Sequence, residues 1–151
     1  MKEELWKETL MHVPIPCVDL ILQHPNTQEF VIGYRKIAPY KNVWALPGGR
    51  MMFGEDLKKA AVRIAREYGM RFSELYLVGV FPVAFSFRSD VAIALASSHV
   101  FGDPIPDGKE FSTFRWVRNA PKPIGKNYEL MISKWRKVKK SNEFLKLNKI
   151  L

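Results

Sequence analysis

The stretch at residues 44–70, WALPGGRMMFGEDLKKAAVRIAREYGM, constrains the fold of this chain more than any other part of the sequence. A short apolar strand ends at Pro47-Gly48-Gly49, and a loop follows. From residue 55 to residue 68, apolar residues recur at intervals of three and four, which predicts an amphipathic helix that ends at Gly69. Glycines permit positive φ and close backbone approach, as a phosphate or metal site often requires. A ligand site and a purely structural turn are therefore both open.

The rest of the chain is mostly strand-like. Apolar and β-branched runs predict strands at 13–22, 28–35, 74–87, 91–102 and 110–117, and helical spacing predicts helices at 2–10 and 126–140. The first two strands are close enough in sequence to form a hairpin. One helix after the third strand and another at the end favour an α/β (α+β) fold, with a mixed sheet packed between helices. We expect one domain over residues 1–151, because no repeat or low-complexity segment divides it.

Composition limits the class of protein. The chain is 47% hydrophobic and 13% aromatic, so it can bury a core and is expected to be globular. No apolar run approaches the roughly 18 residues of a membrane helix, and the N-terminus lacks an apolar signal core. The single cysteine, Cys17, excludes an internal disulfide and is expected to be a buried, inert thiol. These features favour a cytoplasmic protein without a membrane partner.

The chain is basic, with a formal net charge of +9 and a pI near 9.7. This charge favours anionic partners such as nucleotides or nucleic acid. Much of the excess lies in a basic C-terminal helix and tail, which begin at about residue 126. A solvated helix face is the favoured explanation of this region, and nucleic-acid binding is the alternative, for which no recognised motif is present.

The spacing of charged residues in the 44–70 stretch matches a known motif. Glu55 follows Gly49 after five residues, Arg63 follows Glu55 after seven, and Glu67 lies four residues beyond on the same helical face. With Gly69 and Met70, this pattern resembles the box of the Nudix family: Gly, five residues, Glu, seven residues, Arg-Glu, an aliphatic, any residue, Glu-Glu, any residue, Gly, an aliphatic. The resemblance covers most of the chain. It implies the Nudix α/β/α sandwich and hydrolysis of nucleoside diphosphate derivatives.

Three departures from the Nudix box bear on that activity. Ile64 stands where the box has the Glu after its Arg, Tyr68 replaces the second Glu of the Glu-Glu pair, and the final loop is one residue shorter. In the family, the missing carboxylates help to hold divalent metal and to activate water at phosphorus. Isoleucine cannot bind magnesium, which requires hard oxygen ligands. Standard cleavage of the P–O bond with several metal ions is therefore not expected.

The GDP-mannose mannosyl hydrolases are the subfamily that this chain resembles most. They also carry an aliphatic residue after the box Arg, and they split the C–O bond of the sugar. The similar segments are residues 18–22, 32–50 and 114–117. The resemblance implies that Arg35, Arg50 and Arg63 are catalytic and act on the diphosphate, whose oxygens suit guanidinium groups. Surface salt bridges are the alternative for Arg35 and Arg50, and a loop-pinning bridge is the alternative for Arg63.

The same resemblance implies a metal site and a substrate contact. Mg²⁺ (or Mn²⁺) would be held by the Gly49 carbonyl, Glu67 and Glu110, and an exposed side chain without a ligand is the alternative for either carboxylate. Asp19 would bind substrate together with Arg35 and Arg50, and a lone acid in an apolar strand needs such a partner. Phe111 occupies the position of the subfamily's general-base His and has no proton acceptor.

Three functions stay open from the sequence. The first is hydrolysis of a nucleoside diphosphate sugar, GDP-mannose-like, or a related derivative, with slow C–O cleavage and a homodimer implied by the subfamily. The second is a Nudix-fold protein that binds nucleotides with weakened catalysis. The third is action on RNA 5′ ends, for which the basic composition is the only support.

Overall fold

The structure, a computed structural model, describes residues 1–143 and 145–146. The helices are α1 (Glu3–His12), α2 (Leu57–Glu67) and α3 (Lys126–Ser141). The strands are β1 (Ile15–Leu22), β2 (Phe30–Arg35), β3 (Trp44–Ala45), β4 (Gly48–Arg50), β5 (Arg71–Phe72), β6 (Tyr76–Ala84), β7 (Ser89–Ser97), β8 (Val100–Phe101), β9 (Phe111–Val117) and β10 (Leu145–Lys146). The predicted basic region from about residue 126 corresponds to α3 and β10, and its positions 144 and 147–151 lie outside the described residues.

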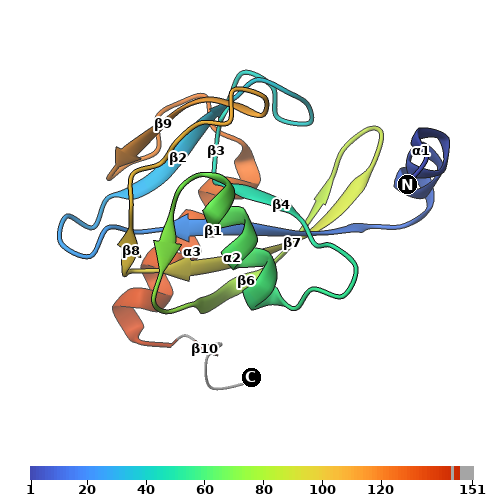
Figure 1. The fold of residues 1–151 in the computed structure, drawn as a ribbon. Coiled ribbons are helices and arrows are strands. Elements are labelled where there is room, and N and C mark those ends of the chain that lie inside the picture. The colour runs from blue at the N-terminus through green and yellow to red at the C-terminus, as the bar shows by residue number, and fades with distance from the viewer. Residues whose placement is uncertain (144, 147–151) are drawn as a thin grey trace.

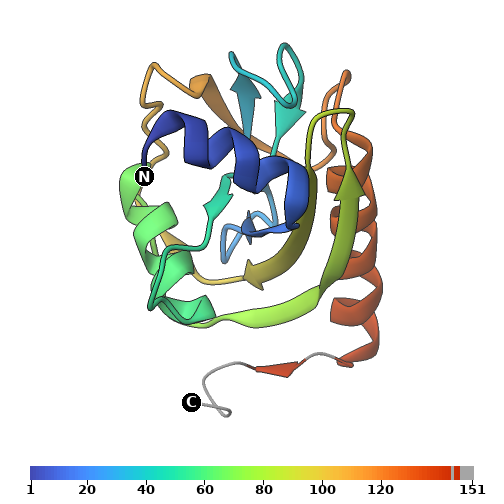
Figure 2. The same cartoon turned by 90° about the vertical axis from the view of Figure 1, so that its right-hand side faces the viewer.

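The strands form a mixed sheet and a smaller antiparallel sheet. The larger has the order β10-β6-β7-β1-β4, in which β1 and β7 run parallel and the other pairs are antiparallel. The smaller has the order β3-β2-β9, and β5 pairs with β8 separately. The strands lie between α2 on one side and α3 on the other (Figures 1 and 2). The predicted α+β fold with a mixed sheet between helices is confirmed.

The predicted hairpin of the first two strands is wrong. β1 lies between β4 and β7, so both of its edges are already paired, whereas β2 pairs with β3 and β9 in the other sheet. Only the isolated bridge between Gln23 and Phe30 joins the two strands across their connecting turn. The strand predicted at 91–102 also divides, because Ser98 and His99 separate β7 from β8. Local periodicity predicts strands well but does not predict their partners.

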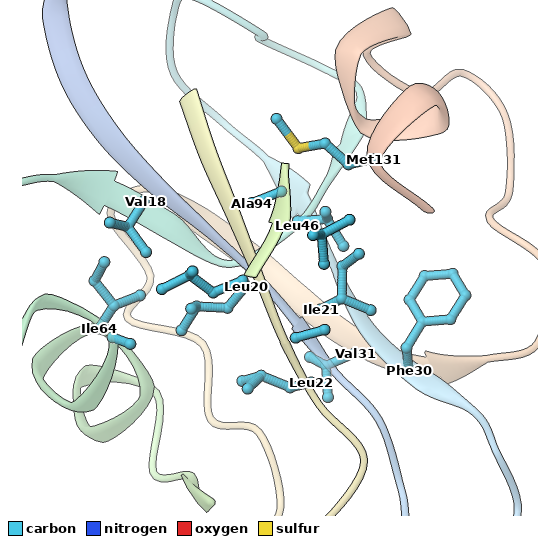
Figure 3. Close-up of a cluster of buried hydrophobic side chains, with 14 of the residues drawn as sticks. Val18, Leu20, Ile21, Leu22, Phe30, Val31, Leu46, Ile64, Ala94 and Met131 are labelled. Carbon is cyan, nitrogen blue, oxygen red and sulfur yellow. The ribbon is translucent and has the colours of Figure 1, made fainter. Parts of the chain in front are cut away.

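The motif-bearing helix is fixed by the core and by its two ends. Ile64 of α2 is fully buried and faces β1, whose Val18 and Leu20 are also fully buried (Figure 3). Burying a side chain of this size contributes about 1.5–3 kcal/mol relative to leaving it exposed. At the N-terminus the Asp56 carboxylate accepts a hydrogen bond from the Lys59 N–H at 2.8 Å, and Gly69 follows the helix with φ of +74°. The charged face of α2 is therefore held in one orientation.

α1 contributes no buried residue and lies at one end of the molecule (Figure 1). It precedes β1 and brings the half-buried Trp6 indole against Arg50. Among the helices that the structure describes, none has the length and apolar character needed to cross a membrane.

Candidate functional site

A cavity of about 230 Å³ opens beside β4, between the two sheets. It brings together residues from α1, β1, β2, β4, β7 and the start of α3. Its charged lining residues are Asp19, Arg35, Arg50, Arg88, Asp90 and Glu110. Gly49 also lines it, so most of the predicted site residues meet here. Arg63 and Glu67 do not line the cavity and lie on the face of α2 instead.

The Gly48-Gly49 pair forms a strand and not the expected turn. Both glycines belong to β4, which runs antiparallel to β1, and neither has positive φ. The close approach that the sequence predicted for glycine is present at Gly48, where an added Cβ would overlap the Asp19 carboxylate. Glycine is therefore needed here because the two backbones and the Asp19 side chain lie too close for any other residue.

Arg50 is the cation best placed to meet an anionic ligand. It is exposed at the mouth of the cavity, and its guanidinium lies 4.5 Å from the centre of the Trp6 ring. No salt bridge among the described residues involves Arg50. The aromatic face holds the guanidinium without neutralising its charge.

Arg35 is buried and already has a carboxylate partner. Its guanidinium donates to Glu110 through Nη1 and to the Ala38 carbonyl through Nη2 at 3.1 Å. The pair links β2 to the segment before β9 and places one positive and one negative charge together on the cavity wall. The salt-bridge alternative for Arg35 is thus present, but inside the cavity and not on the surface.

Asp19 is a buried acid with a shifted titration. Its pKa is raised to about 7, chiefly by burial and to a smaller extent by the nearby Asp90 and Glu110, while Arg35 opposes the shift. The expected arginine partner is therefore Arg35. It acts on Asp19 through its positive charge at a distance, since no hydrogen bond or salt bridge joins the two side chains within the described chain. A carboxyl group with this pKa exchanges its proton near neutral pH.

Arg63 connects α2 to the loop that precedes this helix. Its Nε and Nη2 donate to the Glu55 carboxylate at 2.6 and 3.0 Å, its Nη1 donates to Glu67 at 3.1 Å, and its Nη2 also donates to the Arg50 carbonyl at 2.9 Å. The hydrogen bond from Arg63 lowers the pKa of Glu55 to about 2. This geometry matches the loop-pinning alternative for Arg63.

The three positions that depart from the family pattern are all buried. Ile64 and Phe111 are fully buried, and Tyr68 is 2% exposed. The Tyr68 and Phe111 rings meet edge to face with centroids 5.5 Å apart, and burial raises the pKa of Tyr68. Phe111 is thus part of the core and does not line the cavity. Ile64 and Tyr68 stand in place of carboxylates and Phe111 in place of a histidine, and all three belong to the hydrophobic core.

The residues predicted to hold Mg²⁺ form a poor donor set as they stand. Glu67 is paired with Arg63 and Glu110 with Arg35, so an ion would have to displace an arginine from either carboxylate. Within the described chain, no three His, Cys, Asp or Glu side chains converge as a metal-binding cluster. The metal role of Gly49, Glu67 and Glu110 stays a prediction.

Four residues of the cavity wall each have one buried polar atom without a hydrogen-bond partner. Among the described residues these atoms are Arg35 Nε, Arg88 Nε, Asp90 Oδ1 and Asn127 Oδ1. Arg88 and Asp90 fall between the strands predicted at 74–87 and 91–102 and had no predicted role. A signal was present, because residues two apart in a strand share a face and the Asp lies directly before an apolar run. Their side chains pair at 2.7 Å.

Cys17 and the histidines contribute no second reactive centre. Cys17 lines the cavity and is half-buried, not fully buried as expected, but burial together with Asp90 raises the pKa of its thiol to about 12, so it stays protonated. His24 packs on Trp116, His99 contacts Glu74 at 2.6 Å, and His12 is exposed on α1. None of the three histidines lines the cavity.

Comparison with known proteins agrees with this arrangement. A family model described as the NUDIX domain matches residues 13–120. The MutT NUDIX hydrolase of Burkholderia pseudomallei superposes with a TM-score of 0.74 at 18% identity, over 82% of this chain and 98% of that one. The NUDIX domain of Shewanella oneidensis NrtR, complexed with ADP ribose, gives a TM-score of 0.69 at 17% identity, over 91% and 98%.

One curated protein shares a shorter match. The low-salt glycan biosynthesis protein Agl8 of Haloferax volcanii is 31% identical over 65 residues, which are 43% of this chain. The matched segment spans 40% of that protein's length. The likeness therefore concerns a part of both chains.

Proposed function

Because this chain belongs to the Nudix hydrolase family, we propose that it binds a nucleoside diphosphate sugar in the cavity beside β4 and that any hydrolysis breaks the C–O bond of the sugar. Two known proteins support the substrate class. One is the NrtR domain, whose partner ADP ribose is a nucleoside diphosphate joined to a sugar. The other is the partial match to a glycan biosynthesis protein.

A single observation carries the proposal. The positions that would supply carboxylates for attack on phosphorus, Ile64 and Tyr68, are buried and apolar, whereas Arg50 is exposed at the cavity without a described salt bridge. The chain thus lacks two of the box carboxylates used in P–O chemistry but keeps a cation for a diphosphate. Charged hydrogen bonds of this kind contribute about 1.5–3 kcal/mol.

The chemistry of C–O cleavage suits these residues. Water attacks the sugar carbon, the bond to the diphosphate oxygen breaks, and the electron pair leaves with the diphosphate. Arg50 would stabilise the charge that develops there, and Arg35 would add to the field while it stays paired with Glu110. With Phe111 in the core, no histidine lines the cavity to take the proton from water. General-base catalysis contributes ~10²–10⁴-fold, so turnover should be slow.

Nudix hydrolases generally use a divalent metal such as Mg²⁺, and the predicted ligands of this chain can be tested directly. If an ion displaces the arginines from Glu67 and Glu110, Glu67→Gln and Glu110→Gln should each weaken Mn²⁺ binding in a titration. Unchanged Mn²⁺ affinity in both variants would remove these residues from the assignment. A homodimer also stays a prediction, which sedimentation of the purified protein can check.

A second candidate is a nucleotide-binding protein with little turnover. The observation that favours it is the pairing of Glu55 and Glu67 with Arg63 and of Glu110 with Arg35, which leaves no box carboxylate free within the described chain. This candidate shares the cavity and the ligand class with the first, and only catalysis separates them.

Product analysis tests the proposed function. The protein is incubated separately with GDP-mannose, UDP-glucose and ADP-ribose in ¹⁸O-water with Mg²⁺. Mass spectrometry identifies the products and shows which of them carries the label. We expect free sugar that carries the label, together with unlabelled nucleoside diphosphate. Label in a released phosphate would contradict C–O cleavage, and binding without any product would favour the second candidate.

A further inference from the structure

The unpaired polar atoms of the cavity are not spread evenly over the protein. In the described residues, each buried side-chain N or O that lacks a hydrogen-bond partner belongs to a residue of this one cavity. Three of these four residues, Arg35, Asp90 and Asn127, are themselves less than a tenth exposed. Native proteins pair nearly all such groups, so a cluster of exceptions calls for a ligand that completes their hydrogen bonds.

The cavity has two ends with different charge. At the mouth, Arg50 has no carboxylate partner among the described residues, so that end attracts an anion. At the start of β7, Arg88 Nη2 lies 2.7 Å from Asp90 Oδ2, and the pair is close to neutral as a unit. A diphosphate is favoured at the first end. The second end suits an uncharged polar group, because the Asp90 carboxylate repels phosphate.

The unpaired atoms specify the chemistry of that uncharged group. Arg88 Nε and Arg35 Nε are donors, whereas Asp90 Oδ1 and Asn127 Oδ1 are acceptors. A phosphate ion offers mainly acceptors and cannot satisfy Asp90 and Asn127. A hydroxyl group donates one hydrogen bond and accepts up to two, so neighbouring hydroxyls can satisfy both kinds of atom. The Phe85 ring, beside the Arg88 guanidinium, supplies an apolar wall.

The position of Asp90 is fixed by the sheet. It lies in β7 between two other strands, with its Cα paired to Val83 of β6 and to Ile15 of β1. Side chains on a central strand are held more rigidly than those on loops, which suits the recognition of one arrangement of hydroxyls. Arg88, one residue before β7, is held by Asp90 and by the Phe85 ring.

We infer that Arg88, Asp90 and Asn127 form a subsite for the hydroxyl groups of the sugar, and that this subsite selects the glycosyl part of the ligand. The inference rests on the proposed function, since the diphosphate at Arg50 would direct the sugar inward. The subsite distinguishes a nucleoside diphosphate sugar from the nucleoside diphosphate alone.

Paired affinities test the subsite. Calorimetry is run on the full chain with GDP-mannose, UDP-glucose and ADP-ribose and with the matching GDP, UDP and ADP. In wild type, we expect one sugar nucleotide to bind more tightly than its diphosphate. Asp90→Asn should weaken binding of that sugar nucleotide by about tenfold, the usual loss for one charged hydrogen bond, and should change the affinity for the diphosphate less than about twofold.

Further variants separate the possible failures. Asn127→Leu, of similar size, should give the same selective loss if Asp90→Asn does not fold, and Asn26→Leu in an exposed turn is the control. Equal loss for sugar nucleotide and diphosphate, or no loss in either cavity variant, would overturn the subsite while the proposed function stands. Wild-type protein that binds none of the six nucleotides would overturn both.

Discussion

The box face of α2, formed by Arg63 and Glu67 with Glu55 of the preceding loop, and the cavity beside β4 both contact β4. They differ in how well their polar groups are paired. On the box face, Arg63 satisfies Glu55 and Glu67, and Ile64 and Tyr68 belong to the core. In the cavity, four buried polar atoms have no partner among the described residues, and burial raises the pKa of Asp19 to about 7. One region is complete without a ligand, and the other is not.

This difference separates the roles that a family motif usually combines. Paired charges and packed apolar residues stabilise a fold, whereas unpaired buried groups lower stability and are kept where a ligand completes them. We propose on this basis that the box of this chain serves mainly as a scaffold that positions β4, and that ligand recognition lies in the cavity. Four substitutions test this division of roles.

The largest effect is expected from restoring the family residue at Ile64. Ile64→Glu would bury a carboxylate without a partner and should lower the free energy of unfolding by about 3–5 kcal/mol. Urea unfolding measures the change, and Ile64→Val is the control, expected to cost about 0.5–1.5 kcal/mol. A stable Ile64→Glu variant with faster nucleotide-sugar hydrolysis would show that the box face is an active site after all.

The next largest effect concerns the cavity and depends on pH. The folded-state pKa of Asp19 lies above its unfolded value, so wild-type stability should fall as pH rises from about 4 to about 7 and should then level off. Asp19→Asn lacks this titration and should be more stable than wild type by roughly 2–4 kcal/mol above pH 7, because a tenfold change in the acid's dissociation constant corresponds to about 1.4 kcal/mol. At pH 4 the two proteins should unfold alike.

Unfolding curves across this pH range, with the exposed-loop variant Asp103→Asn as the control, measure the difference. If the difference in unfolding free energy between wild type and Asp19→Asn is constant with pH, the pKa of Asp19 is not raised in the folded protein.

Arg50→Ala tests the diphosphate end of the cavity. Removal of the guanidinium should weaken binding of GDP and ADP by about 1.5–3 kcal/mol and leave thermal stability unchanged, because the side chain is exposed. Calorimetry measures both affinities, and Arg66→Ala, an exposed cation on α2, is the matched control. Wild-type affinity in Arg50→Ala would make Arg50 a surface residue.

The smallest effect is expected at Arg63. Arg63→Ala removes the hydrogen bonds to Glu55, Glu67 and the Arg50 carbonyl and should lower stability by about 1–2 kcal/mol, a value limited by partial exposure to solvent. Affinity for nucleoside diphosphates should change little in calorimetry. A loss of affinity as large as that of Arg50→Ala would move Arg63 from the scaffold to the binding site.

The sequence predicted the helices, the mixed fold and the place of the motif because these depend on local spacing. It did not predict that β1 and β2 lie in different sheets, since strand partners depend on contacts distant in the chain. For the site, the resemblance identified Asp19, Arg35 and Arg50, which do meet in one cavity. It gave no role to Arg88, Asp90 or Asn127, because their meeting depends on the pairing of β7 with β1 and on the position of α3.

The place of ligand contact is the most direct test of whether recognition lies in the cavity and not on the box face. Amide chemical shifts of ¹⁵N-labelled protein are followed while GDP-mannose, UDP-glucose or ADP-ribose, whichever binds most tightly, is added to saturation. We predict the largest changes at Arg50, Asp90 and Asn127, with small changes at Arg63 and Glu67. Changes concentrated on Arg63 and Glu67, with the cavity amides unmoved, would contradict the assignment of ligand recognition to the cavity.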